Sequence, residues 1–164
     1  MKIGILSDSH GKNDRLASAL KLLVGGGAEV LVHCGDIGSA WSVELLGQAG
    51  PPAYLVMGNI DRHADDLQTS AQRCGVHLGW EVVEVPIGPD RYLLATHGHD
   101  EQLLDELITG QQFPFICHGH THHARNQQIG KIRVINPGAL HNTRRCSVAL
   151  LDTAAGEVEF IVVP

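Results

Sequence analysis

Three apolar segments near the start of the chain each stop abruptly at a short polar motif. The segments are "KIGIL", "EVLVH" and "AYLVM", and the motifs that follow them are "SDSH", "CGD" and "GN". A short apolar run bounded by polar or turn-forming residues is typical of a buried strand. Amphipathic segments separate the three runs, so the pattern predicts alternating strands and helices, and hence parallel strand pairing.

The rest of the sequence continues with helices and then mostly with strands. Helices are expected over residues 13–24, 40–48 and 100–110, and a short helix with a loop within 62–79. Strands are expected over 80–98, 113–117, 125–135 and 146–163, and all of these except the second contain a turn. Asn13 and Asp100 can cap the first and last helices, and Val24 is expected on the buried stripe of the first. These elements together predict an α/β protein with both parallel and antiparallel pairing.

The composition is that of one ordinary globular domain. The chain has 164 residues, of which 43% are hydrophobic and 18% are charged, and this is enough to bury a core. No repeat, low-complexity tract or linker divides the sequence. A single domain over residues 1–164 is therefore expected.

Charge and cysteine usage limit the partners and the compartment. The formal net charge of −6 argues against binding of long nucleic acid, which needs many Lys and Arg residues. No apolar stretch is long enough to span a membrane, and the N-terminus turns polar too early for a signal peptide. The four cysteines are widely spaced and include no CxxC pair, which favours reduced thiols. A cytoplasmic protein with no membrane partner is expected, and a homo-oligomer is one option for its assembly.

Residues able to bind a metal ion stand where the predicted strands end. Asp8 and His10 follow the first strand, and positions two apart in an extended chain point the same way. Asp36 follows the second strand, where Gly35 permits a tight turn, and Asn59 follows the third. Because ligands collect beyond the carboxyl ends of strands in open α/β sheets, these side chains are expected to lie together.

Histidines add further candidate ligands. His97 ends a later strand, and His120 and His122 lie in "HGHTHH" behind another. Neutral imidazole is the commonest metal ligand in proteins, and mixed oxygen and nitrogen ligands without thiolate favour Mn, Fe, Zn or a similar ion. Each motif alone has a plainer interpretation, since Asp8 could cap a helix and Asn59 could only shape a turn. The occurrence of all these residues at strand ends favours a metal site.

The ordered motifs "SDSHG", "CGD", "GNID", "HGH", "GHTH" and "NPGA" resemble the calcineurin-like metallophosphoesterase superfamily, in particular its small bacterial and archaeal phosphodiesterase branch. The resemblance extends from Asp8 to about Gly138, which is nearly the whole chain. It implies an α/β fold in four layers, an α/β/β/α sandwich of two mixed β-sheets flanked by helices.

The resemblance also implies two divalent metal ions. One ion would be held by Asp8, His10, Asp36 and His122, and the other by Asp36, Asn59, His97 and His120, with Asp36 shared. Manganese is the first expectation, and Ni, Fe, Zn or Mg are the alternatives.

The activity that the resemblance implies is metal-dependent hydrolysis of phosphoric esters. A phosphodiesterase acting on small phosphodiesters is expected, with a metal-bridging hydroxide attacking phosphorus in line. The alternatives are a phosphomonoesterase or nucleotidase, and a non-catalytic protein-binding scaffold of the same fold, as in the retromer small subunit. No ligand of the pattern is missing, which favours an enzyme over a scaffold.

One position departs from the family pattern. Many members carry a histidine after "GN" that is taken to protonate the leaving group, whereas this chain has Ile60, which has no proton to donate. His99 is the best local candidate for binding phosphate or supplying that proton. The expected catalytic residues are thus Asp36, Asn59 and His99.

Other histidines and arginines match no ligand position. His33, His118 and His123 are expected to be structural, and His63, His77 and His141 to be solvated. Arg144 and Arg145 could meet a phosphate or simply face water.

Overall fold

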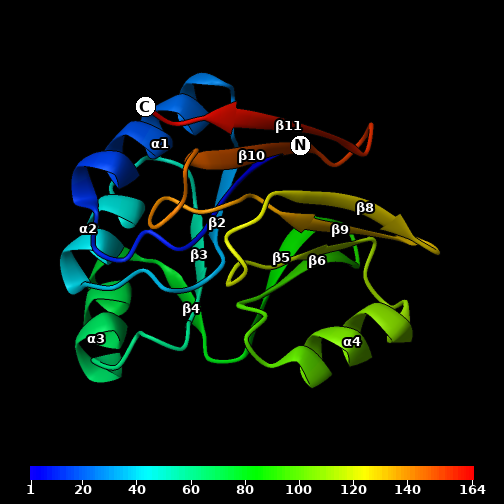
Figure 1. The fold of residues 1–164 in the computed structure, drawn as a ribbon, viewed down its shortest axis with the longest axis horizontal. Helices are drawn as coiled ribbons and strands as arrows, with labels where there is room; N and C mark the ends of the chain where they lie inside the picture. The colour runs from blue at the N-terminus through cyan, green and yellow to red at the C-terminus, as the bar shows by residue number, and fades with distance from the viewer.

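Two β-sheets pack face to face in the computed structural model of the chain, which describes residues 1–164 (Figure 1). The first sheet has the strand order β11 (Glu157–Val162), β10 (Ser147–Asp152), β1 (Lys2–Leu6), β2 (Val30–His33), β3 (Ala53–Val56) and β4 (His77–Gly79). The second has the order β5 (Val82–Gly88), β6 (Arg91–Thr96), β7 (Phe115–Cys117), β9 (Ile132–Asn136) and β8 (Arg125–Ile129). The helices are α1 (Asn13–Gly25), α2 (Ala40–Gly47), α3 (Ala64–Cys74) and α4 (Glu101–Gly110).

Helices cover the outer face of each sheet, which gives the molecule four layers (Figure 1). The helices α1, α2 and α3 lie against the first sheet, and α4 lies against the second. Three apolar clusters fill the interfaces between layers, with Leu23 in the first, Ile5 and Leu93 between the sheets, and Leu104 under α4. The expected α/β/β/α sandwich of two mixed sheets is therefore confirmed.

Strand direction determines where the polar motifs meet. The strands β1, β2, β3 and β4 are parallel, so their carboxyl ends share one edge of the first sheet. The strands β6, β7 and β9 are likewise parallel in the second sheet. Antiparallel β10 and β11 extend the first sheet, and antiparallel β5 and β8 form the edges of the second.

Two expectations for the first helix, the cap at Asn13 and the burial of Val24, are wrong. α1 has Lys12 as its N-cap and no side-chain capping bond, so the predicted cap at Asn13 is wrong. The Asn13 side chain instead accepts a hydrogen bond of 2.7 Å from the Ser42 hydroxyl of α2. Val24 is 38% exposed, because it lies about 100° around the helix from the fully buried Leu23.

Two other helical segments follow the sequence more closely. The cap predicted at Asp100 is confirmed, since its carboxylate accepts the Leu103 N–H at 3.0 Å. The ambiguous segment 62–79 contains α3, which ends at Gly75 with a left-handed φ of 69°, and then the short strand β4. β4 has only three residues, too few to show a strand pattern in the sequence.

None of the four helices combines the length and the apolar character that crossing a bilayer requires. The four cysteines form no disulfide, and Cys34, Cys117 and Cys146 are buried.

We expect Leu23→Ala to lower the free energy of unfolding by about 3 kcal/mol, because truncating a leucine in a packed core leaves a cavity. Leu23 is fully buried between α1 and the first sheet, whereas the adjacent Leu22 is 36% exposed. Leu22→Ala should therefore cost less than about 1 kcal/mol. Urea unfolding of both variants measures the difference, and equal losses would contradict the assignment of the buried face of α1.

Candidate metal centre

Loops that follow strands of both sheets meet at one edge of the molecule. The Asp8 N–H donates to the Gly35 carbonyl at 3.0 Å, and the Gly119 N–H donates to the His97 carbonyl at 3.0 Å. The His120 N–H donates to the Asp8 carboxylate at 3.1 Å, which joins a loop of the first sheet to a loop of the second. Every residue predicted to bind metal lies in these loops or at the start of one, and metal binding itself remains a prediction.

Backbone geometry at these positions is unusual. Eight residues other than glycine have positive φ, and five of them are predicted metal ligands with φ between 47° and 63°. These five are Asp8, His10, Asp36, His120 and His122. Such conformations are uncommon outside glycine, cost about 1–3 kcal/mol each, and persist where the surrounding structure holds them. Their concentration at one edge indicates a functional site.

Two glycines of the motifs are required by close packing. A Cβ atom at Gly58 would overlap the Asp36 carboxylate, and a Cβ atom at Gly119 would crowd the Asp8 carboxylate. Each of these glycines directly precedes a predicted ligand. Bare backbone at both positions therefore lets ligands from different loops approach one another.

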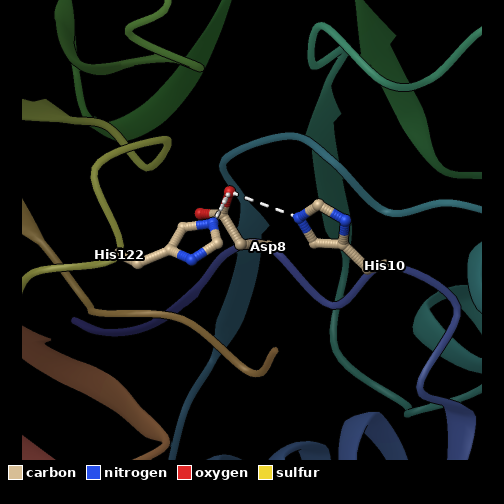
Figure 2. A group of neighbouring side chains, drawn as sticks. All are labelled: Asp8, His10 and His122. Carbon is tan, nitrogen blue, oxygen red and sulfur yellow. Dashed lines mark hydrogen bonds and ion pairs between the residues drawn. The ribbon is translucent and has the colours of Figure 1, made fainter. Parts of the chain in front are cut away.

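Figure 2 shows two imidazoles pointing at the Asp8 carboxylate from opposite sides. His122 Nε2 lies 3.2 Å from Asp8 Oδ1, and His10 Nε2 lies 3.9 Å from the same oxygen. His10 Nε2 is also 3.5 Å from Asp36 Oδ2, and although this nitrogen is buried it has no hydrogen-bond partner. Buried polar atoms in proteins are nearly always bonded, so an orphaned nitrogen facing two carboxylates fits a ligand of a cation.

His97 provides a second test of whether a cation fits. Its Nδ1 donates to the Cys34 carbonyl at 2.8 Å, so Nε2 carries a lone pair when the ring is neutral. That nitrogen lies 2.9 Å from Asn59 Oδ1 and 3.4 Å from Asp36 Oδ1, and both oxygens are acceptors. Three acceptors that face one another need a proton or a cation between them. Metal-binding histidines commonly donate their other ring N–H to a carbonyl, as His97 does.

The ionisation of this pair agrees with that interpretation. Burial by itself lowers the pKa of His97, but the adjacent Asp36 carboxylate outweighs burial and raises it. Burial raises the pKa of Asp36, but the hydrogen bond and the charge of His97 lower it below its usual value. The site therefore favours a positive charge between these two side chains, and a divalent cation would supply it.

The donor atoms form two overlapping groups. The ligand atoms of Asp8, His10 and His122 lie within 4.8 Å of one another, and so do those of Asp8, Asp36 and His97. Asp8 thus lies beside both groups, whereas the resemblance assigns it to one ion only. Oxygen and imidazole donors in these numbers, without thiolate, fit two divalent cations such as Mn or Zn.

His120 and His99 lie at the open side of the second group. His120 Nδ1 is 3.2 Å from Asn59 Oδ1, and both residues are exposed. The exposed His99 ring has its centroid 5.4 Å from that of His97 and 6.2 Å from that of His120. Ile60 contributes only its backbone N–H, which donates to Asp36 Oδ1 at 3.0 Å. His99 can therefore contact a molecule bound at this group.

Asp61 holds two ligand loops together through hydrogen bonds to backbone N–H groups. Its buried carboxylate accepts the N–H groups of Gly58 at 2.8 Å, Gly38 at 2.9 Å and Ile37 at 3.3 Å. Burial raises the pKa of Asp61, and these hydrogen bonds oppose the shift. The only signal in the sequence is a carboxylate two residues beyond Asn59.

His33 and His118 are buried beside ligand loops. His33 Nε2 lies 2.9 Å from the hydroxyl of Ser9, the residue between Asp8 and His10, and His118 Nδ1 lies 3.2 Å from the Gly119 carbonyl. Burial lowers the pKa of His33 to about 3 and that of His118 to about 4, so both rings are neutral near pH 7. Neither ring therefore adds charge to the site.

His141, expected to be solvated, instead packs against His10. Its ring is half-buried, and its centroid lies 4.9 Å from that of His10. Burial lowers the pKa of His141, and so do the nearby charges of His10, Lys12, His122 and Arg15. The loop between β9 and β10 therefore borders the metal centre, a contact that no local pattern predicts.

Comparison with known proteins identifies the family and several relatives of similar sequence. The profile of the calcineurin-like phosphoesterase superfamily domain matches residues 1–156. A phosphodiesterase of Methanocaldococcus jannaschii is 26% identical over an alignment of 165 residues that covers 99% of this chain and 99% of that protein.

Solved structures share the fold. The structure of a novel archaeal phosphodiesterase superposes with a TM-score of 0.91 at 26% identity, covering 99% of this chain and 100% of that chain. Vps29 of Chaetomium thermophilum superposes with a TM-score of 0.72 at 16% identity, covering 99% and 94%. The second likeness concerns the fold alone.

We expect loss of the His33 imidazole to flatten the pH dependence of stability. Because burial lowers its pKa from 6.5 to about 3, only the unfolded chain binds this proton as the pH falls below about 6.5. Between about pH 7 and about pH 5 the parent should lose about 2 kcal/mol more unfolding free energy than His33→Gln. Urea unfolding in chelator measures this, with the exposed His63→Gln as the control. Parallel curves for parent and His33→Gln would contradict a neutral buried ring.

Proposed function

We propose that this chain, which belongs to the calcineurin-like phosphoesterase superfamily, is a phosphodiesterase that hydrolyses small phosphodiesters with two bound divalent cations. Family membership confirms the resemblance carried by the motifs. The observation on which the proposal depends is the convergence of donor atoms around Asp36, with His10 Nε2 on one side and His97 Nε2 on the other. The archaeal phosphodiesterase matched over nearly its whole length supports the choice of a diester.

The proposed ligands are those expected from the sequence. Asp8, His10, Asp36 and His122 would hold one cation, and Asp36, Asn59, His97 and His120 the other. When bound, the cations supply positive charge for the phosphoryl oxygens and a water that ionises near neutral pH for attack on phosphorus. Manganese is the cation that we propose for activity, since the ligands are oxygens and imidazoles.

The chain's own side chains orient the ligands and contact the substrate. The Cys34 carbonyl fixes the ring orientation of His97 through a bond of 2.8 Å, which leaves Nε2 directed at the centre. The Ile60 N–H donates to Asp36 Oδ1 and holds the carboxylate in place. The exposed His99 imidazole is placed to donate a proton or a hydrogen bond to a phosphoester held at the second group.

The cysteines bear on the cellular compartment, and the apolar clusters bear on the domain organisation. Four free cysteines support a reducing compartment, and we place the protein in the cytoplasm. We also propose that residues 1–164 act as one domain, since the three apolar clusters join all four layers.

The manganese-loaded protein should hydrolyse bis(para-nitrophenyl) phosphate, and excess chelator should abolish the reaction. We expect Asp36→Asn to lower the rate by about a hundredfold or more and to weaken cation binding in both groups, because its oxygens face both. Absorbance at release of nitrophenolate measures the rate, and titration calorimetry with Mn²⁺ measures binding. Asp105→Asn, which removes an exposed carboxylate on α4, is the matched control.

The outcomes separate the candidate functions. Faster hydrolysis of a phosphomonoester than of the diester would instead make the protein a phosphomonoesterase. Cation binding without turnover of either ester would favour a scaffold. Full activity of Asp36→Asn would contradict its shared role.

His99→Ala should slow hydrolysis of alkyl phosphodiesters by about a hundredfold and that of aryl phosphodiesters much less. An alkoxide leaving group needs a proton more than a phenolate does, and Ile60 has none to give. Rates for a series of leaving groups of different pKa measure the effect, with the exposed His123→Ala as the control. Equal losses for both ester types would show that His99 binds phosphate and does not protonate the leaving group.

A further inference from the structure

Positive side chains border the metal centre on the side of His10. The chain as a whole is acidic, with 18 Asp and Glu residues against 12 Lys and Arg residues. Residues 11–18 and 137–146 nevertheless contain Lys12, Arg15, Arg144 and Arg145, and Asp14 is their only acidic residue. Positive charge beside the centre would attract an anionic substrate, although the chain as a whole is acidic.

Hydrogen bonds hold these two segments against the centre and against each other. Arg15 Nη1 donates to the Leu140 carbonyl at 2.8 Å, and the Leu140 N–H donates to the Ser7 carbonyl at 3.2 Å. Ser7 directly precedes Asp8, so the loop between β9 and β10 lies next to a predicted metal ligand. Figure 1 shows this loop, in orange, beside the dark blue segment that follows β1.

His141 packs against His10, Lys12 follows His10 in the chain, and Arg15 bonds the residue before His141. The His141 ring centroid is 4.9 Å from that of His10. Lys12 follows His10 by two residues and is exposed, and neither Lys12 nor Arg15 forms an ion pair with a carboxylate. The Arg15 guanidinium has five N–H donors and gives one of them to Leu140, so the others are free for a ligand.

An open cleft adjoins these side chains. It has a volume of about 710 Å³ and is lined by residues 11–15, including Lys12, Asp14 and Arg15, and by Ser18 and Pro164. A volume of this size falls within the range of small-molecule sites.

We propose that Lys12, Arg15 and His141 form a second anion subsite, and that the substrate is a phosphodiester carrying a further phosphate on one arm. Lys12 and Arg15 supply charge-assisted hydrogen bonds to that phosphate, and the His141 ring supplies a further N–H donor. A nucleoside or a group of similar size joins the two phosphates. This proposal rests on the proposed phosphodiesterase function, because the scissile phosphate occupies the metal centre.

The test uses two esters with the same leaving group. These are para-nitrophenyl esters of thymidine 5′-phosphate, with and without a phosphate on the 3′-hydroxyl. With the manganese-loaded parent, kcat/KM should be about tenfold higher for the 3′-phosphorylated ester, the effect of one charge-assisted hydrogen bond. Lys12→Gln should remove most of this preference. Lys21→Gln removes the same charge from the far end of α1 and should retain it.

Equilibrium binding distinguishes failure of the subsite from failure of the proposed function. Thymidine 3′,5′-bisphosphate should bind the manganese-loaded parent about tenfold more tightly than thymidine 5′-phosphate, and Lys12→Gln should bind both about equally. If neither ester is hydrolysed but the binding preference holds, the function is wrong and the subsite stands. Equal kcat/KM for the two esters together with equal binding of the two nucleotides would overturn the subsite. An equal loss of preference in Lys21→Gln would also overturn it, because the effect would then be one of overall charge.

Discussion

The carboxylate of Asp36 lies between imidazoles from the two sheets, and the rest of this edge is built around that contact. One oxygen is 3.5 Å from His10 Nε2, and the other is 3.4 Å from His97 Nε2. The approach requires a left-handed turn at Asp36 itself, with φ of 55°, and a residue without Cβ at Gly58. Asp61 then fixes the relative position of the two loops through its bonds to Gly38 and Gly58. The unusual backbone is thus a consequence of bringing acceptors together.

The left-handed backbone of the ligand residues costs free energy, and this cost links the stability of the core to the site. Five left-handed ligand residues at about 1–3 kcal/mol each amount to a large fraction of a typical domain's stability of about 5–15 kcal/mol. Apolar packing between the sheets, where Ile5 and Leu93 are fully buried, has to offset that strain. A cation that binds only the folded chain would add to stability by mass action. The apolar core therefore offsets the strain of the ligand residues, and bound cations would raise the free energy of unfolding.

Sequence patterns predict the helices and strands that follow a local hydrophobic periodicity. They do not predict features that depend on contacts between residues far apart in the sequence. Apolar runs ending in polar motifs predict the strands around the centre, and the parallel pairing of β1 and β2 explains why Asp8 and Asp36 meet. The cap at Asn13 was wrong because its side chain bonds Ser42 of another helix. His141 was expected in solvent because nothing in its own segment shows that the loop packs on His10. The roles of individual ligands are still predictions, since side-chain convergence is compatible with more than one sharing pattern, as Asp8 illustrates.

The two sides of the centre differ, and the difference constrains how a substrate lies across it. The group containing His97 lies beside the exposed His99, whereas His10 of the other group packs against His141, whose neighbour Leu140 is bonded by Arg15. In-line displacement puts the attacking water and the leaving group on opposite sides of phosphorus. The two proposals place the second phosphate at Lys12 and the leaving group at His99, where a proton donor is needed because Ile60 has none. Both proposals thus require a single orientation of the substrate, and the charged arm is the one that stays on the product phosphate.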